Sequence, residues 1–204
     1  MFGERDVQLI PPMLKVARDG KTGFQLGANE NLFDYTYIGN VAHAHILAAS
    51  KLLDLVQRYE RSPPPAVENT DADNIEIDGE QFIITNQSPI YFWDFARMVW
   101  FMYTMRSPLG LQPSKTLAST WVIPEPLAWF IGNLVAGIYW LFRLGLPRLS
   151  PAIVRIACLP RYYRITKSRT VLGYTPIWSL EEGLERTINW FCEQERVEAA
   201  KKGQ

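Results

Sequence analysis

NLFDYTYIGNVAHAHILAASKLLDL, residues 31–55, changes its hydrophobic period partway along its length. Phe33, Tyr35 and Tyr37 alternate with shorter or polar residues, which predicts a short strand with one buried face. After Tyr37 the apolar residues gather on one side of a helix, and Asn40 is the expected N-cap because its side-chain oxygen can accept a backbone N–H. The stretch therefore predicts a strand-to-helix corner, where α/β folds tend to bind ligands.

Further elements are expected on both sides of this corner. A helix is expected over about 7–18 and a short strand around Phe24 and Leu26, between glycines that break the chain. Residues 81–85 alternate as a strand does. Ser88-Pro89 is expected to open an aromatic-rich helix that ends near Met105.

The last expected helix carries the sharpest local signal in the chain. Ser179 and Glu182 have the spacing of a capping box, in which each side chain binds the other's backbone N–H. A buried stripe should follow it, formed by Leu180, Leu184, Ile188 and Phe191. The charged tail after this stripe is expected to fray.

Composition excludes several classes of function. The chain of 204 residues has no formal net charge, so nothing favours a polyanionic partner such as nucleic acid. Cys158 and Cys192 are too few for a disulfide framework and fit a reducing compartment. His43 and His45 are two residues apart and do not share a helix face, so no metal site is expected.

Residues 126–142, PLAWFIGNLVAGIYWLF, contain no ionisable charge. As a helix they would reach about 25 Å, slightly less than the hydrocarbon thickness of a bilayer. Aromatic residues lie near the ends of the segment, and arginines, including Arg143 and Arg148, follow it, which is typical of a membrane interface. Three interpretations remain open: insertion into one leaflet, a complete span, or a helix covered by protein.

The segment FDYTYIGNVAHAHILAA resembles the 3β-hydroxysteroid dehydrogenase/isomerase family of extended short-chain dehydrogenases, in particular its sterol-4α-carboxylate 3-dehydrogenase (decarboxylating) branch. Two further stretches agree in order and spacing: DGEQFIITNQSPIYFWDFARMVW at 78–100 and LGYTPIWSLEEGLERTINWF at 172–191. The resemblance implies an α/β, Rossmann-type fold. This chain would be its carboxy-terminal part, with a substrate-binding lobe and a membrane-associating helical segment.

The resemblance also divides the chain into five expected parts. Residues 1–58 would be the last part of the nucleotide-binding side of the α/β core, 59–77 a surface loop, and 78–120 the substrate-binding lobe. Residues 121–170 would be the apolar, membrane-associating helical segment with its basic flank. Residues 171–204 would be the C-terminal helix and tail.

Two features needed for catalysis are missing from the sequence. No Gly-rich turn of the G-x-G-x-x-G type is present, so no pyrophosphate-binding loop is expected here. The family's catalytic Tyr-x-x-x-Lys would lie upstream of Met1. Tyr163 and Lys167 match that pattern literally, but they lie in a basic run after the apolar segment, so we assign no catalytic residue.

The candidate site residues lie in the N-terminal turn, at the strand-to-helix corner and in the aromatic-rich helix. FGERD, residues 2–6, resembles the family's loop after the last strand of the nucleotide-binding half, which would put Phe2 and Gly3 near the nicotinamide end of NAD or NADP. The residues expected to bind substrate are Arg5, Asp6, Tyr37, Asn40 and Trp93. For these, a structural role such as capping or a surface ion pair is equally open.

The function implied by the resemblance is that of the substrate-binding portion of an NAD(P)-dependent 3β-hydroxysteroid dehydrogenase, acting on a sterol-4α-carboxylate. The expected partners are the sterol, membrane lipid through residues 121–146, and a second copy or other sterol-biosynthesis enzymes. The expected location is the cytoplasmic face of the endoplasmic reticulum membrane. The alternatives are a truncated, non-catalytic sterol-binding or scaffold protein, and a dehydrogenase of nucleotide sugars, which the apolar 89–142 region disfavours.

Overall fold

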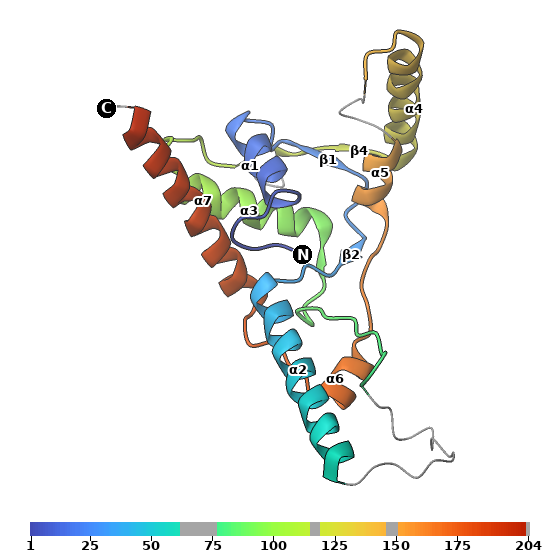
Figure 1. The fold of residues 1–204 in the computed structure, drawn as a ribbon. Helices are drawn as coiled ribbons and strands as arrows, with labels where there is room; N and C mark the ends of the chain where they lie inside the picture. The colour runs from blue at the N-terminus through green and yellow to red at the C-terminus, as the bar shows by residue number, and fades with distance from the viewer. Residues whose placement is uncertain (62–76, 115–118, 146–150, 203–204) are drawn as a thin grey trace.

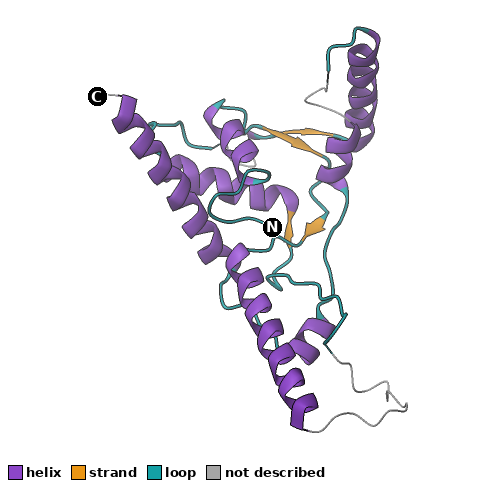
Figure 2. Ribbon diagram, viewed as in Figure 1, coloured by secondary structure: helices purple, strands orange, loops and turns teal. Residues whose placement is uncertain are grey.

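The computed structural model describes residues 1–61, 77–114, 119–145 and 151–202. Within these ranges the chain is mainly helical, with short strands between the helices (Figures 1 and 2). The helices are α1 (Ile10–Arg18), α2 (Ile38–Arg61), α3 (Phe92–Arg106), α4 (Glu125–Leu141), α5 (Pro151–Cys158), α6 (Thr166–Leu172) and α7 (Leu180–Lys202). The strands are β1 (Phe24–Leu26), β2 (Leu32–Phe33), β3 (Ile90–Tyr91) and β4 (Trp121–Ile123).

The described strands form two small sheets. Strand β1 pairs in parallel with β4, with Gln25 opposite Val122. Strand β2 pairs antiparallel with β3, with Leu32 opposite Tyr91. Each sheet has two strands, so the helices supply most of the buried surface.

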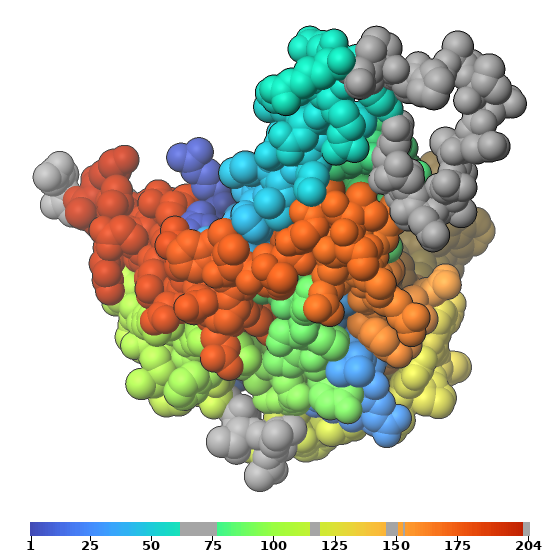
Figure 3. All heavy atoms as spheres, turned by 90° about the horizontal axis from the view of Figure 1, so that it is seen from below, coloured from blue at the N-terminus to red at the C-terminus, as the bar shows by residue number. Residues whose placement is uncertain are grey.

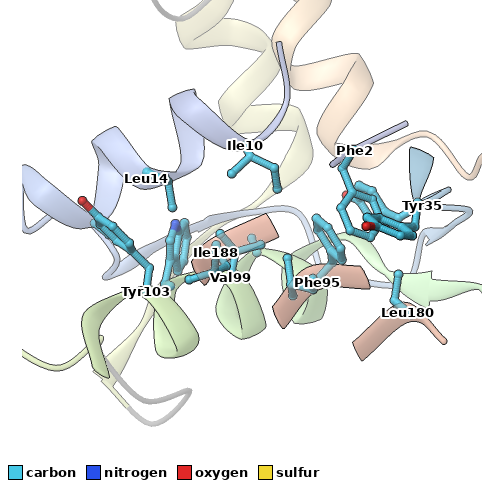
Figure 4. Close-up of a cluster of buried hydrophobic side chains, with 14 of the residues drawn as sticks. Phe2, Ile10, Leu14, Tyr35, Phe95, Val99, Tyr103, Leu180 and Ile188 are labelled. Atoms are coloured by element: carbon cyan, nitrogen blue, oxygen red, sulfur yellow. The ribbon is translucent and has the colours of Figure 1, made fainter. Parts of the chain in front are cut away.

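Helix α3 lies between α1 and α7 in the main core (Figure 4). Aromatic side chains of α3 pack with aliphatic side chains of α1 and α7, and several side chains of this cluster are completely buried. These residues are Ile10 and Leu14 of α1, Phe95, Val99 and Tyr103 of α3, and Leu184 and Ile188 of α7. The core therefore joins the first and last helices of the chain.

Helix α2 has a much smaller attachment to the rest of the protein. Its Ala44 packs with Ile165, Leu172 and Tyr174 in a second buried cluster. Figure 3 shows α2 projecting beyond the body of the molecule, next to the segment that carries α6. Apolar side chains farther along α2, such as Ile46, are exposed.

Helix α4 extends away from the body of the molecule, as Figure 1 shows, and packs against α5. Its buried Ala128 and Gly132 are small, which lets two helices approach closely. The opposite face is apolar and exposed; it consists of Leu127, Phe130, Leu134, Ile138 and Leu141. None of the helices that the structure describes is both long and apolar enough to cross a membrane.

Several expected elements are confirmed. Helix α4 matches the predicted 126–142 segment within one residue, and strand β1 lies where the short strand was expected. The capping box forms: the backbone N–H of Ser179 donates to Glu182 Oε2 at 2.8 Å, and that of Glu182 donates to Ser179 Oγ at 3.1 Å. The following residues are helical through Lys202, so the expectation of a frayed tail is wrong for that range.

Three other predictions are wrong. Helix α2 begins at Ile38, so Asn40 lies in its first turn and is not its N-cap. Helix α3 begins at Phe92, because Ser88-Pro89 precedes a short strand, β3. Residues 81–85 run without strand pairing: side-chain hydroxyls of Thr36 and Tyr174, rather than the backbone of a neighbouring strand, donate to the carbonyls of Ile84 and Thr85. Most of the expected 59–77 surface loop, and Arg148, fall outside the described residues.

Candidate functional site

Three chain segments end at the predicted strand-to-helix corner. The backbone N–H of Phe2 donates to Thr36 O, and the N–H of Ile38 donates to Phe2 O, each at 2.8 Å, which makes a parallel bridge between Phe2 and Tyr37. Asn86, after the extended 81–85 segment, accepts the backbone N–H of Tyr37 at 2.9 Å through Oδ1. The carboxyl ends of parallel segments are the usual place for ligands in α/β folds.

Asn40 holds this corner together from the inside. Its side chain is fully buried, and its Nδ2 donates to Asn86 Oδ1 and to the carbonyl of Trp178 at 2.9 and 2.8 Å. Its Oδ1 accepts the backbone N–H groups of Ile177 and Trp178, both at 3.0 Å. The structure therefore gives Asn40 an architectural role, joining α2 to the segment before α7.

Tyr37 connects the corner to the N-terminal turn and to α7. Its hydroxyl donates to the Glu4 carboxylate at 3.0 Å and accepts from Arg186 Nε at 3.0 Å. The Arg186 guanidinium also lies over the Trp178 ring, 4.6 Å from its centroid. Burial raises the pKa of the Tyr37 phenol, so this group keeps its proton and suits binding rather than base catalysis.

Arg5 and Asp6 lie in the same turn but are held differently. Asp6 accepts the backbone N–H groups of Gln8 and Ile10, each at 2.8 Å, and so fixes the start of α1. Arg5 is exposed, has a left-handed backbone with φ 64°, and forms no hydrogen bond or ion pair with any other described residue. Of the expected substrate residues, Arg5 is the one with a free charged group.

Trp93 lies apart from this corner, at the start of α3. Its Nε1 donates to the Leu26 carbonyl at 2.8 Å, and its backbone N–H donates to Asn29 Oδ1 at 2.9 Å. These bonds hold the 26–31 loop, which lines a pocket of about 220 Å³ together with Glu125 and Cys158. The structure thus brings Arg5, Asp6, Tyr37 and Asn40 together and leaves Trp93 at a second place.

The two residues expected near the cofactor do not form a cradle by themselves. Phe2 is buried in the core, and both of its backbone groups are paired. A Cβ on Gly3 would lie 2.3 Å from Ile38 Cγ2, so the space beside this glycine is filled by protein. Phe2 and Gly3 therefore do not form an NAD(P) site by themselves, and their role at the nicotinamide end stays a prediction.

The rejected Tyr163-x-x-x-Lys167 match does not form a helical pair. Tyr163 precedes α6, and its backbone N–H donates to Asp34 Oδ2 at 2.7 Å. Lys167, inside α6, forms an ion pair with Glu80. Among the described residues, no group of three His, Cys, Asp or Glu side chains is placed to hold a metal ion.

Sequence reasoning missed three residues of the corner: Asn86, Trp178 and Arg186. Asn86 had a usable signal, because a polar residue directly after a predicted strand lies at the ligand-binding edge of a sheet. Arg186 had none, because it reaches Glu4 from 182 residues away and only the packing of α7 brings them together.

Comparison with known proteins agrees with the resemblance. The chain is 40% identical over 195 residues to the decarboxylating sterol-4-alpha-carboxylate 3-dehydrogenase of Saccharomyces cerevisiae, covering 95% of this chain and 48% of that protein. It is 31% identical to the human protein of that name, covering 97% of this chain and 46% of the relative. The chain thus spans about half the length of these relatives.

The structural comparison supports the fold. The crystal structure of gox2253 superposes with a TM-score of 0.53 at 16% sequence identity, covering 95% of this chain and 47% of that one. Residues 1–112 match the model of the 3-beta hydroxysteroid dehydrogenase/isomerase family. This match includes the N-terminal turn, the corner and α3, and the chain belongs to the 3-beta hydroxysteroid dehydrogenase/isomerase family.

Proposed function

We propose that this chain is the substrate-binding part of an NAD(P)-dependent sterol-4α-carboxylate 3-dehydrogenase that decarboxylates its product. The observation that carries the proposal is the similarity to relatives of that name over about 95% of the chain. Family membership supports a 3β-hydroxysteroid dehydrogenase in general. The names of the relatives are the basis for proposing a sterol with a 4α-carboxylate as the substrate.

The reaction has two steps. The 3β-hydroxyl is first oxidised to a ketone; NAD(P), held by residues outside this chain, would supply the hydride acceptor for that oxidation. The resulting 3-keto acid then loses carbon dioxide, because the neighbouring ketone accepts the electron pair of the breaking bond. In this proposal the present chain binds and orients the sterol, and the base and the Gly-rich loop belong to the half that this chain does not match.

A chimera tests the proposal. The chain replaces the half that it matches in the Saccharomyces cerevisiae relative, and the purified protein is given a 4α-carboxy-3β-hydroxysterol with NAD or NADP. We expect reduced cofactor and labelled carbon dioxide from the 4α-carboxyl group in equal amounts. A well-folded chimera that turns over no sterol would contradict the proposal.

We also propose that residues 121–146 contact membrane lipid. The support is the exposed apolar surface of α4, on which Phe130 is 67% exposed and Trp140 is 82% exposed. No Asp, Glu, Lys, Arg or His lies between Glu125 at the start of α4 and Arg143 after its end. An apolar helix face with a basic flank suits insertion into the interface of an anionic leaflet.

Vesicle flotation tests this contact. We expect the chain to float with anionic phospholipid vesicles and Phe130→Glu to weaken binding at least tenfold, since a charge replaces a side chain worth about 1.5–3 kcal/mol when buried. Leu53→Glu is the matched control, because Leu53 on α2 is 62% exposed, close to the value for Phe130, but lies outside the segment. Equal losses in both variants would show non-specific adsorption. The endoplasmic reticulum location, a homodimer and contacts with other sterol-biosynthesis enzymes stay predictions.

A further inference from the structure

In the turn at residues 2–6, every residue except Arg5 is fixed by hydrogen bonds or close packing. Phe2 is fixed by two backbone hydrogen bonds, and Gly3 lies against Ile38 with no room for a side chain. Asp6 is tied to the first turn of α1. Arg5 alone is exposed, although the residues on both sides of it are anchored.

Arg5 has a backbone conformation that is unfavourable for a residue with a side chain, so the surrounding structure must maintain it. Its φ of 64° lies in the left-handed region, which a residue with a Cβ rarely adopts. Such a conformation persists only where the surrounding structure determines it, and it is concentrated at functional sites. A glycine would adopt it without strain.

A clamp from the other end of the chain fixes the residue before Arg5. The Glu4 carboxylate accepts from the Tyr37 hydroxyl at 3.0 Å and from Arg186 Nε at 3.3 Å. Arg186 is itself held over the Trp178 ring. Because Glu4 is engaged by these groups, its carboxylate is directed at Tyr37 and Arg186, while the Arg5 cation forms no ion pair with a described residue.

We propose that Arg5 binds the carboxylate of the sterol substrate and that Arg186 is a positioning residue acting through Glu4 and Tyr37. This rests on the proposed function, which provides a substrate with one anionic group. A guanidinium matches a carboxylate in a two-bond geometry, and a free one at the carboxyl end of the Phe2–Tyr37 bridge lies where α/β folds bind ligands. Since decarboxylation removes the anion, the contact favours substrate over product.

The test uses the chimera described above and two sterols, one with a 4α-carboxyl and one with a neutral 4α-methyl group. In Arg5→Gly we expect the ratio of kcat/KM for the carboxylated to the neutral sterol to fall about 10- to 100-fold, the usual effect of losing a hydrogen bond to a charged group. Arg5→Lys should recover part of that ratio, because lysine keeps the positive charge but lacks the planar guanidinium that forms two parallel hydrogen bonds. Glycine fits the backbone, so thermal stability should not fall.

A second pair of variants tests the positioning role of Arg186. Arg186→Met should lower the same ratio severalfold, by loosening Glu4 and the turn. Arg196→Met is the matched control on α7: of the residues that the structure describes, Arg196 forms an ion pair only with Glu193 of its own helix, and both activities should stay unchanged.

Three outcomes separate the explanations. Equal losses on both sterols in Arg5→Gly would make the residue structural and overturn the proposal. A raised KM for NAD(P) with both sterols would place the cation at the cofactor and overturn it as well. If the chimera shows no turnover, which counts against the proposed function, the ratio of equilibrium affinities for the two sterols, measured by quenching of tryptophan fluorescence, decides the role of Arg5.

Discussion

Helices α7 and α2 carry the same kind of sequence pattern but differ in burial. In α7, Leu184 and Ile188 are completely buried against α3. In α2, a helix of similar length, Ile46 is 68% exposed and Leu53 is 62% exposed. An apolar stripe therefore predicts a helix and the face that can be buried, while burial itself requires a partner element.

The largest loss in the free energy of unfolding is expected from truncating a core leucine of α7. Leu184→Ala should lower the free energy of unfolding by about 3 kcal/mol, because it removes buried methyl groups and leaves a cavity. Urea denaturation of the chain measures this loss. Leu184→Met, which keeps the volume, should cost less than about 1.5 kcal/mol. Similar losses in both variants would mean that packing around Leu184 is loose.

The next effect should come from the polar attachment of α2. Asn40→Ala removes the acceptor of the partly buried N–H groups of Ile177 and Trp178 and the donor to buried Asn86, so we expect a loss of about 2 kcal/mol. Asn133→Ala is the matched control: among the described residues this exposed asparagine of α4 bonds only to Trp129 O of its own helix, so its loss should cost less than about 0.5 kcal/mol. If Asn40→Ala were as mild, α2 would be held by its apolar contacts alone.

A smaller and pH-dependent effect should come from Tyr174, in the cluster that packs on α2. Its hydroxyl donates to Thr85 O at 2.9 Å, and burial raises its pKa to about 12. The folded protein holds this proton more tightly than the unfolded chain, so the stabilisation is complete below about pH 10 and is lost as the pH rises through 12. Tyr174→Phe should cost about 1 kcal/mol at neutral pH.

Denaturation at several pH values tests this prediction. Between pH 10 and 12 the variant should lose less stability than the original chain. Part of the alkaline loss should remain, because burial also raises the pKa values of Tyr35 and Tyr103. Parallel curves for the two proteins would exclude Tyr174 as a source of the loss.

The smallest effect should be on the exposed stripe of α2. Leu53→Ala should change the free energy of unfolding by less than about 0.5 kcal/mol, because Leu53 is exposed and both residues favour helices. Measured beside Leu184→Ala, it tests the contrast between the two helices directly. A loss above about 2 kcal/mol would show that this face is covered in solution, and sedimentation would then identify a second copy.

Local signals in the sequence predicted well where they depended on neighbours along the chain. The Ser179–Glu182 capping box formed as its spacing predicts, because both bonds lie within one helical turn. The Ser88-Pro89 signal failed, because residues 90–91 pair with β2 and the helix starts only after them. Asn40 failed as an N-cap for a similar reason: distant groups at Asn86 and Trp178 occupy its side chain.

The candidate site was also predicted only in part from the sequence. The resemblance pointed to the FGERD turn and the Tyr37–Asn40 corner, and these lie together in the structure. Residues 81–85 had the alternation of a strand but form no ladder, because side chains such as those of Thr36 and Tyr174 donate to their carbonyls and no described backbone pairs with them.

By itself, the sequence determined the family, the α7 and α4 helices and the position of the corner, because periodicity, capping and turn chemistry act over a few residues. Only the tertiary structure decided which apolar stripe is buried, which distant groups bond to the Asn40 side chain, and that Arg186 binds Glu4 across 182 residues. These depend on contacts between elements far apart in the chain, and no local pattern encodes them.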